Sequence, residues 1–176
     1  MRTNIALIGF MGTGKTAMGQ LLAEKLGRNF VELDLLIERK VGKSIPEIFQ
    51  QDGETTFREL EIEATREVAQ GRNLVIACGG GVVLNKINTD RLRQNAIMVY
   101  LTASPEVILK RVASEAGQRP LLEVDDPALT VRDMLRFREP FYERAADITV
   151  NTSNLDINAI SEQIIGKLKE DEGFDL

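Results

Sequence analysis

Residues 9–16 read GFMGTGKT and satisfy the pattern G-x-x-x-x-G-K-[S/T], which occurs between a strand and a helix in phosphate-binding proteins. Just before them, the apolar run at 5–8 predicts a buried parallel strand. Just after them, apolar residues recur at helical spacing from Met18 to Leu26, and Gly27 is a typical residue at the end of a helix. A strand, a glycine-rich loop and a helix, in this order, form the setting in which the pattern binds phosphate.

The chemistry of phosphate binding explains the spacing of these residues. Glycines let the backbone turn tightly, and the N–H groups of the loop then surround an anion together with the positive end of the helix. Lys15 can reach the β- and γ-phosphates, and the Thr16 hydroxyl can ligate Mg²⁺. The sequence therefore predicts that ATP or another nucleoside triphosphate binds with Mg²⁺. We expect its contacts to come from Gly12, Thr13, Gly14, Lys15, Thr16 and Ala17.

Composition narrows the class of protein and the chemistry. The 176 residues are 43% hydrophobic and 28% charged, which is typical of one soluble domain spanning residues 1–176. A net charge of −5 argues against nucleic acid as a partner. A single cysteine excludes an internal disulfide, and the lack of histidine excludes Ser-His and Cys-His catalysis. Carboxylates are then the natural general bases.

The chain has no segment that predicts a membrane or secretory protein. Its longest apolar runs fall well short of the roughly 20 residues that a membrane span needs. The apolar run near the N-terminus lasts only a few residues before the glycine-rich loop, which is too short for a signal peptide. We expect a cytoplasmic protein, and a monomer.

Strand-like and helix-like segments alternate along the chain. After the first strand we expect strands at 30–33, closed by Asp34, and at 74–76, 96–101 and 148–150. We expect helices at 35–41, 54–69, 89–93, 104–115, 130–145 and 157–168. We also expect a short helix that begins after a capping residue, Ser44. Residues 116–127 predict a mobile loop, and residues 169–176 an acidic, frayed tail. The alternation predicts an α/β fold with a parallel sheet covered by helices on both faces.

Three groups of polar or glycine residues follow predicted strands. Thr16 comes after the first strand, Asp34 after the second, and the triplet Gly79, Gly80 and Gly81 after the third. In parallel sheets, ligands bind beyond the carboxyl ends of the strands. We therefore expect these residues to share one crevice.

Two classes of nucleotide-binding protein fit the loop. A GTPase would need the guanine-reading sequence N-K-x-D, and the nearest string, at 85–88, ends in Asn. A small-molecule kinase would need an acceptor pocket, a base for a hydroxyl and a lid carrying positive charge, and candidates for all three are present.

The ordered set of motifs is similar to that of shikimate kinases. It consists of residues 9–16, Phe30-x-Glu32-x-Asp34, Gly53-Glu54-x-x-Phe57-Arg58-x-x-Glu61, Gly79-Gly80-Gly81, Arg119-Pro120-Leu121 and Arg138-x-Pro140-x-Tyr142. The resemblance runs from about residue 3 to 168. It implies a three-layer P-loop fold with a five-stranded parallel sheet of order 2-3-1-4-5 and a mobile lid at about 112–127. It also implies transfer of the γ-phosphoryl of ATP to the 3-hydroxyl of shikimate.

The resemblance also implies roles for residues of the acceptor site. Arg58 and Arg138 match the positions that hold the shikimate carboxylate, a task that suits guanidinium groups. Asp34 matches the residue that binds the ring hydroxyls and serves as base or orienter. Gly79, Gly80 and Gly81 would bring backbone close to the substrate, and Glu61 would orient Arg58.

Other positions match residues that act on the nucleotide and the metal. Arg119 matches a lid arginine that closes over the phosphates and, with Lys15, neutralises the transferring group. Arg111 matches a residue that stacks on the adenine, with residues 151–154 lining its pocket. Glu32 stands where the family usually has Asp, which helps to hold Mg²⁺ through water, so the metal shell is expected to differ in detail.

Two other functions stay open at this point. A kinase for another small anion, such as gluconate or a nucleoside monophosphate, would use the same fold with a different acceptor pocket. A non-catalytic module would bind ATP without any dependence on an acceptor.

Overall fold

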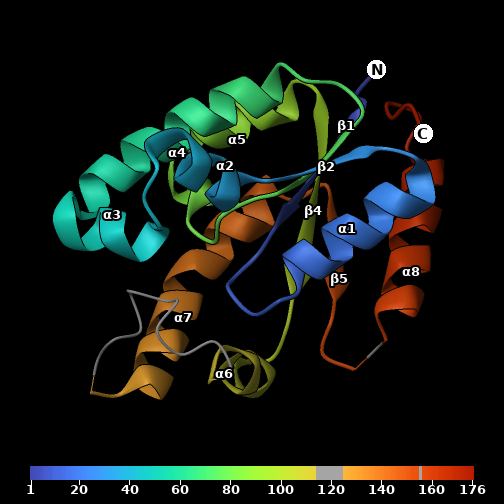
Figure 1. Cartoon of the computed structure of the whole chain (residues 1–176). Helices are drawn as coiled ribbons and strands as arrows, with labels where there is room; N and C mark the ends of the chain where they lie inside the picture. Colours follow the sequence, from blue (N-terminus) through green and yellow to red (C-terminus); the bar gives the residue numbers. More distant parts are fainter. Residues whose placement is uncertain (114–124, 155) are drawn as a thin grey trace.

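The carboxyl end of one parallel sheet carries most of the residues of interest. The computed structural model describes residues 1–113, 125–154 and 156–176. Its five strands are β1 (Asn4–Ile8), β2 (Asn29–Glu32), β3 (Leu74–Ala77), β4 (Ala96–Thr102) and β5 (Ile148–Asn151). They pair in parallel in the order β2-β3-β1-β4-β5, which confirms the predicted sheet (Figure 1).

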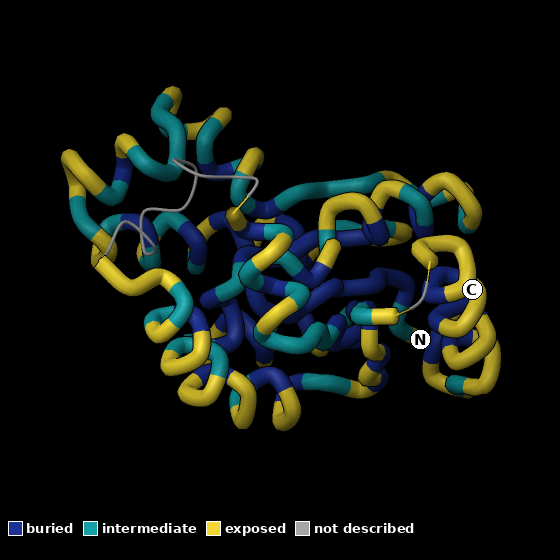
Figure 2. Tube along the Cα trace, turned by 90° about the horizontal axis from the view of Figure 1, so that it is seen from below, coloured by how far each residue is buried: buried dark blue, intermediate teal, exposed yellow. Residues whose placement is uncertain are grey.

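The sheet divides the interior into two hydrophobic cores, because successive side chains of a strand point to opposite faces. In β1, Ile5 and Leu7 pack on one side with α1 (Lys15–Leu26) and α8 (Ile157–Glu170). Ala6 and Ile8 pack on the other side, in a core that takes residues from α2 to α7. Strands buried on both faces read as continuous apolar runs. All of β1 is buried, as are β3 and β4 apart from Leu74 and Thr102 at their ends, and buried segments fill the middle of the molecule in Figure 2.

The remaining helices lie between and after these strands. They are α2 (Leu33–Val41), α3 (Ile45–Gln51), α4 (Gly53–Ala69), α5 (Lys86–Arg93), α6 (Pro105–Ala113) and α7 (Pro127–Ala145), with a short 3₁₀ helix, η1 (Val82–Leu84). Gly27 and Gly42 end α1 and α2 in the left-handed conformation, with φ of 63° and 72°. Ser44 caps α3, as predicted, and does so reciprocally with Glu47.

Three of the expected boundaries were wrong, and the first is the start of α5, which begins at Lys86 rather than Thr89. Strand β2 ends at Glu32, and Asp34 lies in the first turn of α2, because the fully buried Leu33 enters the core as a helical residue. Helix α7 begins at Pro127 rather than Thr130. The Asp126 side chain accepts the backbone N–H of Leu129 and caps the helix, whereas the Thr130 hydroxyl donates back to the Asp126 carbonyl.

The C-terminal tail is packed, although we expected it to fray. Phe174 is buried, and its neighbours Gly173 and Asp175 exchange backbone hydrogen bonds with Arg2 at 2.9 Å each. The Arg28 guanidinium lies over the Phe174 ring, 4.8 Å from its centroid. The tail therefore joins the edge of the fold where the chain begins.

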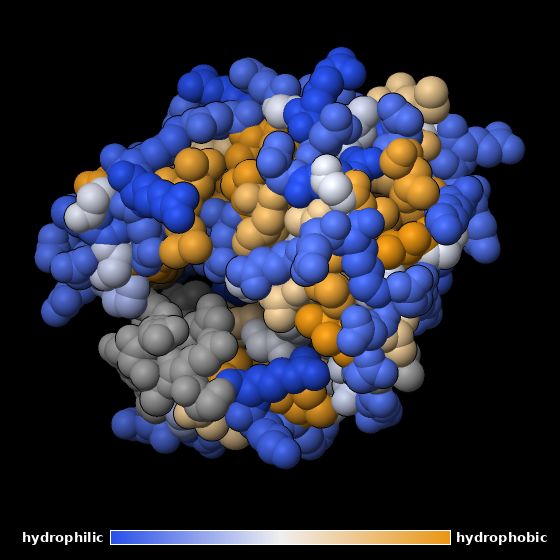
Figure 3. Space-filling model, turned by 45° about the vertical axis from the view of Figure 1, so that its right-hand side comes forward, coloured by the Kyte–Doolittle hydropathy of each residue, from blue (hydrophilic) through white to orange (hydrophobic). Residues whose placement is uncertain are grey.

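Polar side chains cover most of the face seen in Figure 3, and hydrophobic ones gather in small areas between them. Within residues 1–113, 125–154 and 156–176, no helix has both the length and the apolar character needed to cross a bilayer.

Candidate active site

A cavity of about 220 Å³, here called the loop cavity, lies beside the glycine-rich loop. Its walls come from the loop and α1 on one side and from the ends of β2 and β3 on the other. They are Met11, Gly12, Gly14, Lys15, Thr16, Ala17, Glu32, Asp34, Ala77, Cys78 and Gly80. The structure thus brings the loop, Asp34 and one member of the glycine triplet together, as the sequence predicts.

Backbone geometry explains why the loop needs its glycines. Gly14 has φ of 89° and precedes the first residue of α1. A Cβ at Gly9 would lie 2.4 Å from the carbonyl oxygen of Leu101, so only glycine fits there. The Lys15 ammonium donates to the carbonyls of Gly9 and Phe10 at 2.9 Å each. With no acidic residue in the first turn of α1, the helix end and Lys15 present positive charge to the cavity.

Arg111 lies behind the loop and fastens it to the end of β5. Its guanidinium donates to the Gly12 carbonyl and to the Thr152 carbonyl, both at 3.0 Å. The Thr152 hydroxyl in turn donates to the Thr13 carbonyl at 3.1 Å. Arg111 is therefore attached to the loop, but neither Arg111 nor the loop residue Thr13 lines the loop cavity. Stacking of Arg111 on adenine stays an expectation.

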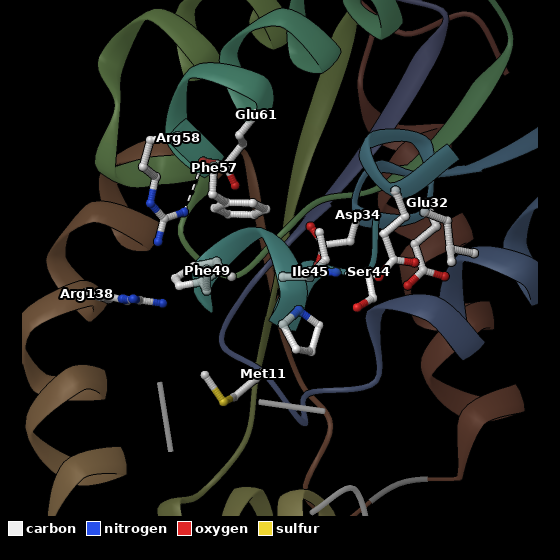
Figure 4. A pocket seen from close by; sticks show the side chains of 14 residues that line it. Met11, Glu32, Asp34, Ser44, Ile45, Phe49, Phe57, Arg58, Glu61 and Arg138 are labelled. Atoms are coloured by element: carbon white, nitrogen blue, oxygen red, sulfur yellow. Dashed lines mark hydrogen bonds and ion pairs between the residues drawn. The ribbon is translucent and has the colours of Figure 1, made fainter. Parts of the chain in front are cut away.

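A second cavity of about 450 Å³, here called the arginine cavity, adjoins the first. The two share Met11, Glu32, Asp34 and Gly80, and the remaining walls are Leu35, Glu38, Ser44, Ile45, Pro46, Phe49, Phe57, Arg58, Glu61 and Arg138. In Figure 4, Arg58 and Arg138 stand on one side, from α4 and α7, and Asp34 and Glu32 on the other. A ligand with a carboxylate at one end and a hydroxyl at the other fits this distribution of charge.

Two carboxylates hold Arg58 in place. Its Nη1 donates to Glu61 Oε1 at 3.1 Å, and its Nη2 donates to Glu54 Oε1 at 3.1 Å. Glu54 is half exposed, whereas the Glu61 side chain is only 1% exposed. The buried pair fixes the direction of the guanidinium more strongly, because it is less screened by water.

Burial raises the pKa of Glu61 to about 7 from its ordinary value of 4.5. The positive charges of Arg58 and Arg138 lower this pKa, and the nearby negative charge of Asp34 raises it, but desolvation is the largest effect. Glu61 Oε2 receives no hydrogen bond from a described residue. The folded protein therefore binds a proton at Glu61 more tightly than the unfolded chain does.

This difference predicts how stability depends on pH. Between about pH 4.5 and 7 the folded state holds more of the Glu61 proton, so the free energy of unfolding should fall as pH rises through this window. The loss should be on the order of 1–3 kcal/mol. Chemical unfolding at several pH values should show this decline in the unaltered protein and a flatter profile in Glu61→Gln, which has no proton to lose. Parallel profiles for the two proteins would contradict the raised pKa.

The glycine triplet lies against the charged side chains of both walls. A Cβ at Gly79 would lie 2.9 Å from Asp34 Oδ1 and 3.0 Å from Glu61 Oε2. A Cβ at Gly81 would lie 2.3 Å from Arg58 Nη1. Glycine at both positions therefore leaves the space that Asp34, Glu61 and Arg58 occupy, and the triplet is more than a strand exit.

Arg138 reaches the cavity from α7 and is 94% buried, with 6% relative exposure. Its guanidinium carbon lies 5.8 Å from the centroid of the Phe10 ring, in the glycine-rich loop. Tyr142, one turn further along α7, donates its phenol hydrogen to the Gly80 carbonyl. Arg138 is thus fixed between the loop and the triplet.

The donors near the loop fit a magnesium ion. Thr16 and Glu32 both line the loop cavity and offer hard oxygen atoms. The part of the chain that the structure describes contains no group of three His, Cys, Asp or Glu residues able to hold a metal. A magnesium ion here would therefore take most of its ligands from phosphate and water, as this ion commonly does.

Sequence reasoning missed much of the arginine cavity. Ile45, Pro46 and Phe49 on α3 form its apolar wall, and Glu38 Oε1 accepts the backbone N–H of Ile45 at 2.8 Å. The one available signal was the spacing of Asp34 and Glu38, which puts two carboxylates on one face of α2. Arg119, and the expected lid apart from residues at its two ends, lie outside the described residues.

Comparison with known proteins agrees with this geometry. The family model for shikimate kinase matches residues 11–169. The shikimate kinase of Caldanaerobacter subterraneus subsp. tengcongensis is 47% identical over 162 residues, covering 92% of this chain and 94% of that protein. The structure of shikimate kinase from Acinetobacter baumannii in complex with shikimate superposes with a TM-score of 0.93 at 38% identity, covering 98% of this chain and 96% of that one.

A more distant neighbour shares the fold alone. A gluconokinase from Sinorhizobium meliloti 1021 covers 97% of this chain and 94% of its own, with a TM-score of 0.61 at 19% identity. The two shikimate kinases are, in contrast, 47% and 38% identical to this chain, and the family model matches residues 11–169. The chain belongs to the shikimate kinase family.

Proposed function

We propose that this enzyme transfers the γ-phosphoryl group of ATP to the 3-hydroxyl of shikimate, giving shikimate 3-phosphate and ADP, a step of chorismate and aromatic amino-acid biosynthesis. One observation supports the assignment most directly. A cavity with two arginines at one end shares Asp34, at its other end, with the cavity of the phosphate-binding loop. An acceptor held by its carboxylate would then present a hydroxyl to the γ-phosphate.

Each end of the acceptor has a matching group in this proposal. Arg58 and Arg138 bind the carboxylate through charge-assisted hydrogen bonds, which are stronger than neutral ones. Asp34 accepts the hydrogen bond of the attacking hydroxyl. Gly79, Gly80 and Gly81 keep side chains out of the space between them. Phe49 and Phe57 offer apolar faces, which suit the carbon ring of shikimate better than an open-chain polyol such as gluconate.

The reaction needs little covalent chemistry from the protein. The acceptor oxygen forms a bond to the γ-phosphorus, and the bond from that phosphorus to the bridging oxygen of the β-phosphate breaks. The hydroxyl proton passes to Asp34, and ADP leaves. Lys15 and the N–H groups of the loop stabilise the negative charge on the transferring group and on the leaving phosphate. Arg119 is proposed to add charge from the lid, and Arg111 to contact the adenine.

Binding of the carboxylate is tested by removing either partner. Arg58→Ala should raise the KM for shikimate by about 10- to 150-fold, the cost of one charge-assisted pair, with a smaller change in kcat. The methyl ester of shikimate should show a similar loss with the unaltered enzyme. Arg58→Ala should then have nearly the same KM for the ester as the unaltered enzyme has. Steady-state ADP release measures all four combinations.

Gly81→Ala supplies a matched control for Arg58. Its new methyl group would meet the tip of the Arg58 side chain, which can move, while the backbone of Gly81 has φ of −100° and tolerates alanine. Gly81→Ala should therefore raise the KM for shikimate and leave the KM for ATP unchanged. An unchanged KM for shikimate in both variants would remove Arg58 from the acceptor site.

We propose that Mg²⁺ accompanies ATP and that Thr16 and Glu32 help to hold it, Glu32 through water. When bound, the ion neutralises phosphate charge. Glu32→Ala should need about 10-fold more Mg²⁺ for half-maximal rate, in line with losing a residue that orients metal-bound water, whereas Glu32→Asp should behave nearly normally. Rates measured across a Mg²⁺ titration check this. The same half-saturating Mg²⁺ in Glu32→Ala would exclude Glu32 from the metal site.

The proposal includes a monomer acting in the cytoplasm, where ATP is supplied. Each chain has its own loop cavity and arginine cavity, so one chain is sufficient for the chemistry described. Sedimentation of the purified protein, with and without both substrates, checks the oligomeric state.

A further inference from the structure

Tyr142 is a buried polar residue that the reaction does not use directly. It lies on α7, four residues after Arg138, and its side chain is fully buried. A phenol hydroxyl in such a place is costly unless it forms a hydrogen bond. Tyr142 donates its hydrogen to the carbonyl of Gly80, so this hydrogen bond to the glycine triplet offsets the cost of burying the hydroxyl.

Gly80 is the residue through which the two cavities meet. It lines both of them. A Cβ placed on Gly80 would lie 3.6 Å from the backbone nitrogen of Met11 in the phosphate loop and 3.7 Å from Arg138 Nη1. The backbone at Gly80 therefore sits directly between the loop that binds phosphate and the guanidinium at the acceptor end.

Tyr142 and Arg138 both approach Gly80, Tyr142 through its hydrogen bond to the carbonyl and Arg138 with its Nη1 3.7 Å from where a Cβ would lie. Burial is the largest effect on the phenol and raises its pKa, while the charge and hydrogen bonding of the Arg138 guanidinium lower it in part. The phenol stays neutral at physiological pH, so it keeps the hydrogen that it donates to Gly80. Its lone pairs remain to receive hydrogen from Arg138.

We propose that the Tyr142 hydroxyl is a positioning group for the acceptor, because it joins the Arg138 guanidinium to the Gly80 backbone at the boundary between the two cavities. This inference rests on the proposed function, in which Arg138 binds the shikimate carboxylate. The hydroxyl holds the guanidinium in the direction that the carboxylate needs. Losing it should weaken acceptor binding without altering the phosphate loop.

The Tyr142 ring has a separate, structural task that must be distinguished from the task of its hydroxyl. It stacks on Tyr100 of β4, with ring centroids 5.0 Å apart and an angle of 22° between the planes. Stacking requires the ring and not the oxygen. Tyr142→Phe keeps the ring and removes only the hydroxyl. Tyr100→Phe is a matched control, because it removes a phenol hydroxyl from the other ring of the same stacked pair.

Kinetics of the two variants test the proposal. Tyr142→Phe should raise the KM for shikimate by about 5- to 10-fold, as expected for a buried hydrogen bond, with the KM for ATP unchanged and kcat altered by less than about threefold. Tyr100→Phe should leave all three values unchanged. In the Arg138→Ala background, Tyr142→Phe should add almost nothing to the KM for shikimate, because two residues acting through one contact are not additive.

The outcomes separate this inference from the proposed function. If Arg138→Ala raises the KM for shikimate and Tyr142→Phe does not, the positioning role is overturned and the acceptor site stands. If Arg138→Ala leaves the KM for shikimate unchanged, the assignment of Arg138 in the proposed function fails, and the role of Tyr142 fails with it. If Tyr142→Phe raises the KM for ATP as much as the KM for shikimate, the substitution disrupts the fold in general, and the proposal is overturned.

A second measurement covers the case in which Tyr142→Phe does not fold. The chain has two tyrosines, so labelling with 3-fluorotyrosine yields two fluorine NMR signals, which Tyr100→Phe assigns. Addition of shikimate to the labelled enzyme should shift the Tyr142 signal more than the Tyr100 signal, because Arg138 acquires a carboxylate partner. A Tyr142 signal that does not respond to saturating shikimate would overturn the proposal.

Discussion

Lys15→Ala is expected to lower kcat by at least about 10³-fold, because it removes the fixed charge that stabilises the transferring phosphoryl group. Lys15 begins α1, and its ammonium lies against the loop carbonyls of Gly9 and Phe10 at 2.9 Å. This position puts a fixed positive charge beside the place where the β- and γ-phosphates would lie. Alanine removes the charge while keeping the helix, because it has the highest helix propensity of any residue.

The matched control for Lys15 lies on the same helix. Lys25 pairs with Glu162 at 2.5 Å on the exposed side, away from both cavities. Lys25→Ala should change stability by less than about 1 kcal/mol, the usual worth of an exposed ion pair, and leave kcat unchanged. ADP release at saturating ATP and shikimate compares the two variants. Retention of more than a tenth of the normal kcat in Lys15→Ala would contradict the assigned role.

Asp34→Asn should fold normally and lose about 10²- to 10⁴-fold in kcat, the range for a missing general base. Asp34 lines both cavities, and a carboxylate there can accept the proton that leaves the acceptor hydroxyl. Asparagine keeps the size and a hydrogen-bonding oxygen but cannot take up that proton. The KM for shikimate should change less than kcat, because the amide still binds a hydroxyl.

Glu38→Gln is the control for Asp34→Asn, because it removes a negative charge from the same helix and the same cavity. Glu38 lies one turn later on α2 and also lines the arginine cavity, but its oxygen accepts the backbone N–H of Ile45, which a glutamine oxygen also does. Its kcat should stay within about threefold of normal. Equal losses of kcat in the two variants would mean that any change of charge on α2 disturbs the reaction, and Asp34 would lose its special role.

The sequence predicts well wherever local geometry constrains the residue type. The loop at residues 9–16 requires glycine at positive φ, and so do the ends of α1 and α2, so Gly27 marked the end of α1 correctly and Gly42 ends α2 in the same way. The five apolar runs placed the five strands, because a strand buried on both faces has few polar residues. The order of the strands came from the resemblance to a known family, since apolar runs do not specify their neighbours.

The walls of the arginine cavity were harder to predict because they depend on packing between distant elements. Phe57 on α4 reads as an ordinary core residue, and it does pack in the core while also facing the cavity. Tyr142 and Gly80 are 62 residues apart, and no local pattern predicts the hydrogen bond from the Tyr142 hydroxyl to the Gly80 carbonyl. Phe174 is buried only because the tail meets the start of the chain at Arg2, which also requires the folded sheet.

ADP release measured with a panel of acceptors tests whether this enzyme phosphorylates shikimate. Shikimate should stimulate ADP release strongly over the rate with ATP alone, whereas gluconate and nucleoside monophosphates should not, because neither presents a carboxylate and a ring hydroxyl at the spacing of the two arginines and Asp34. Stimulation by shikimate alone, lost in Asp34→Asn, is the result that we predict. Stimulation by gluconate or a nucleoside monophosphate but not by shikimate would contradict the account, and so would ADP release that is indifferent to every acceptor.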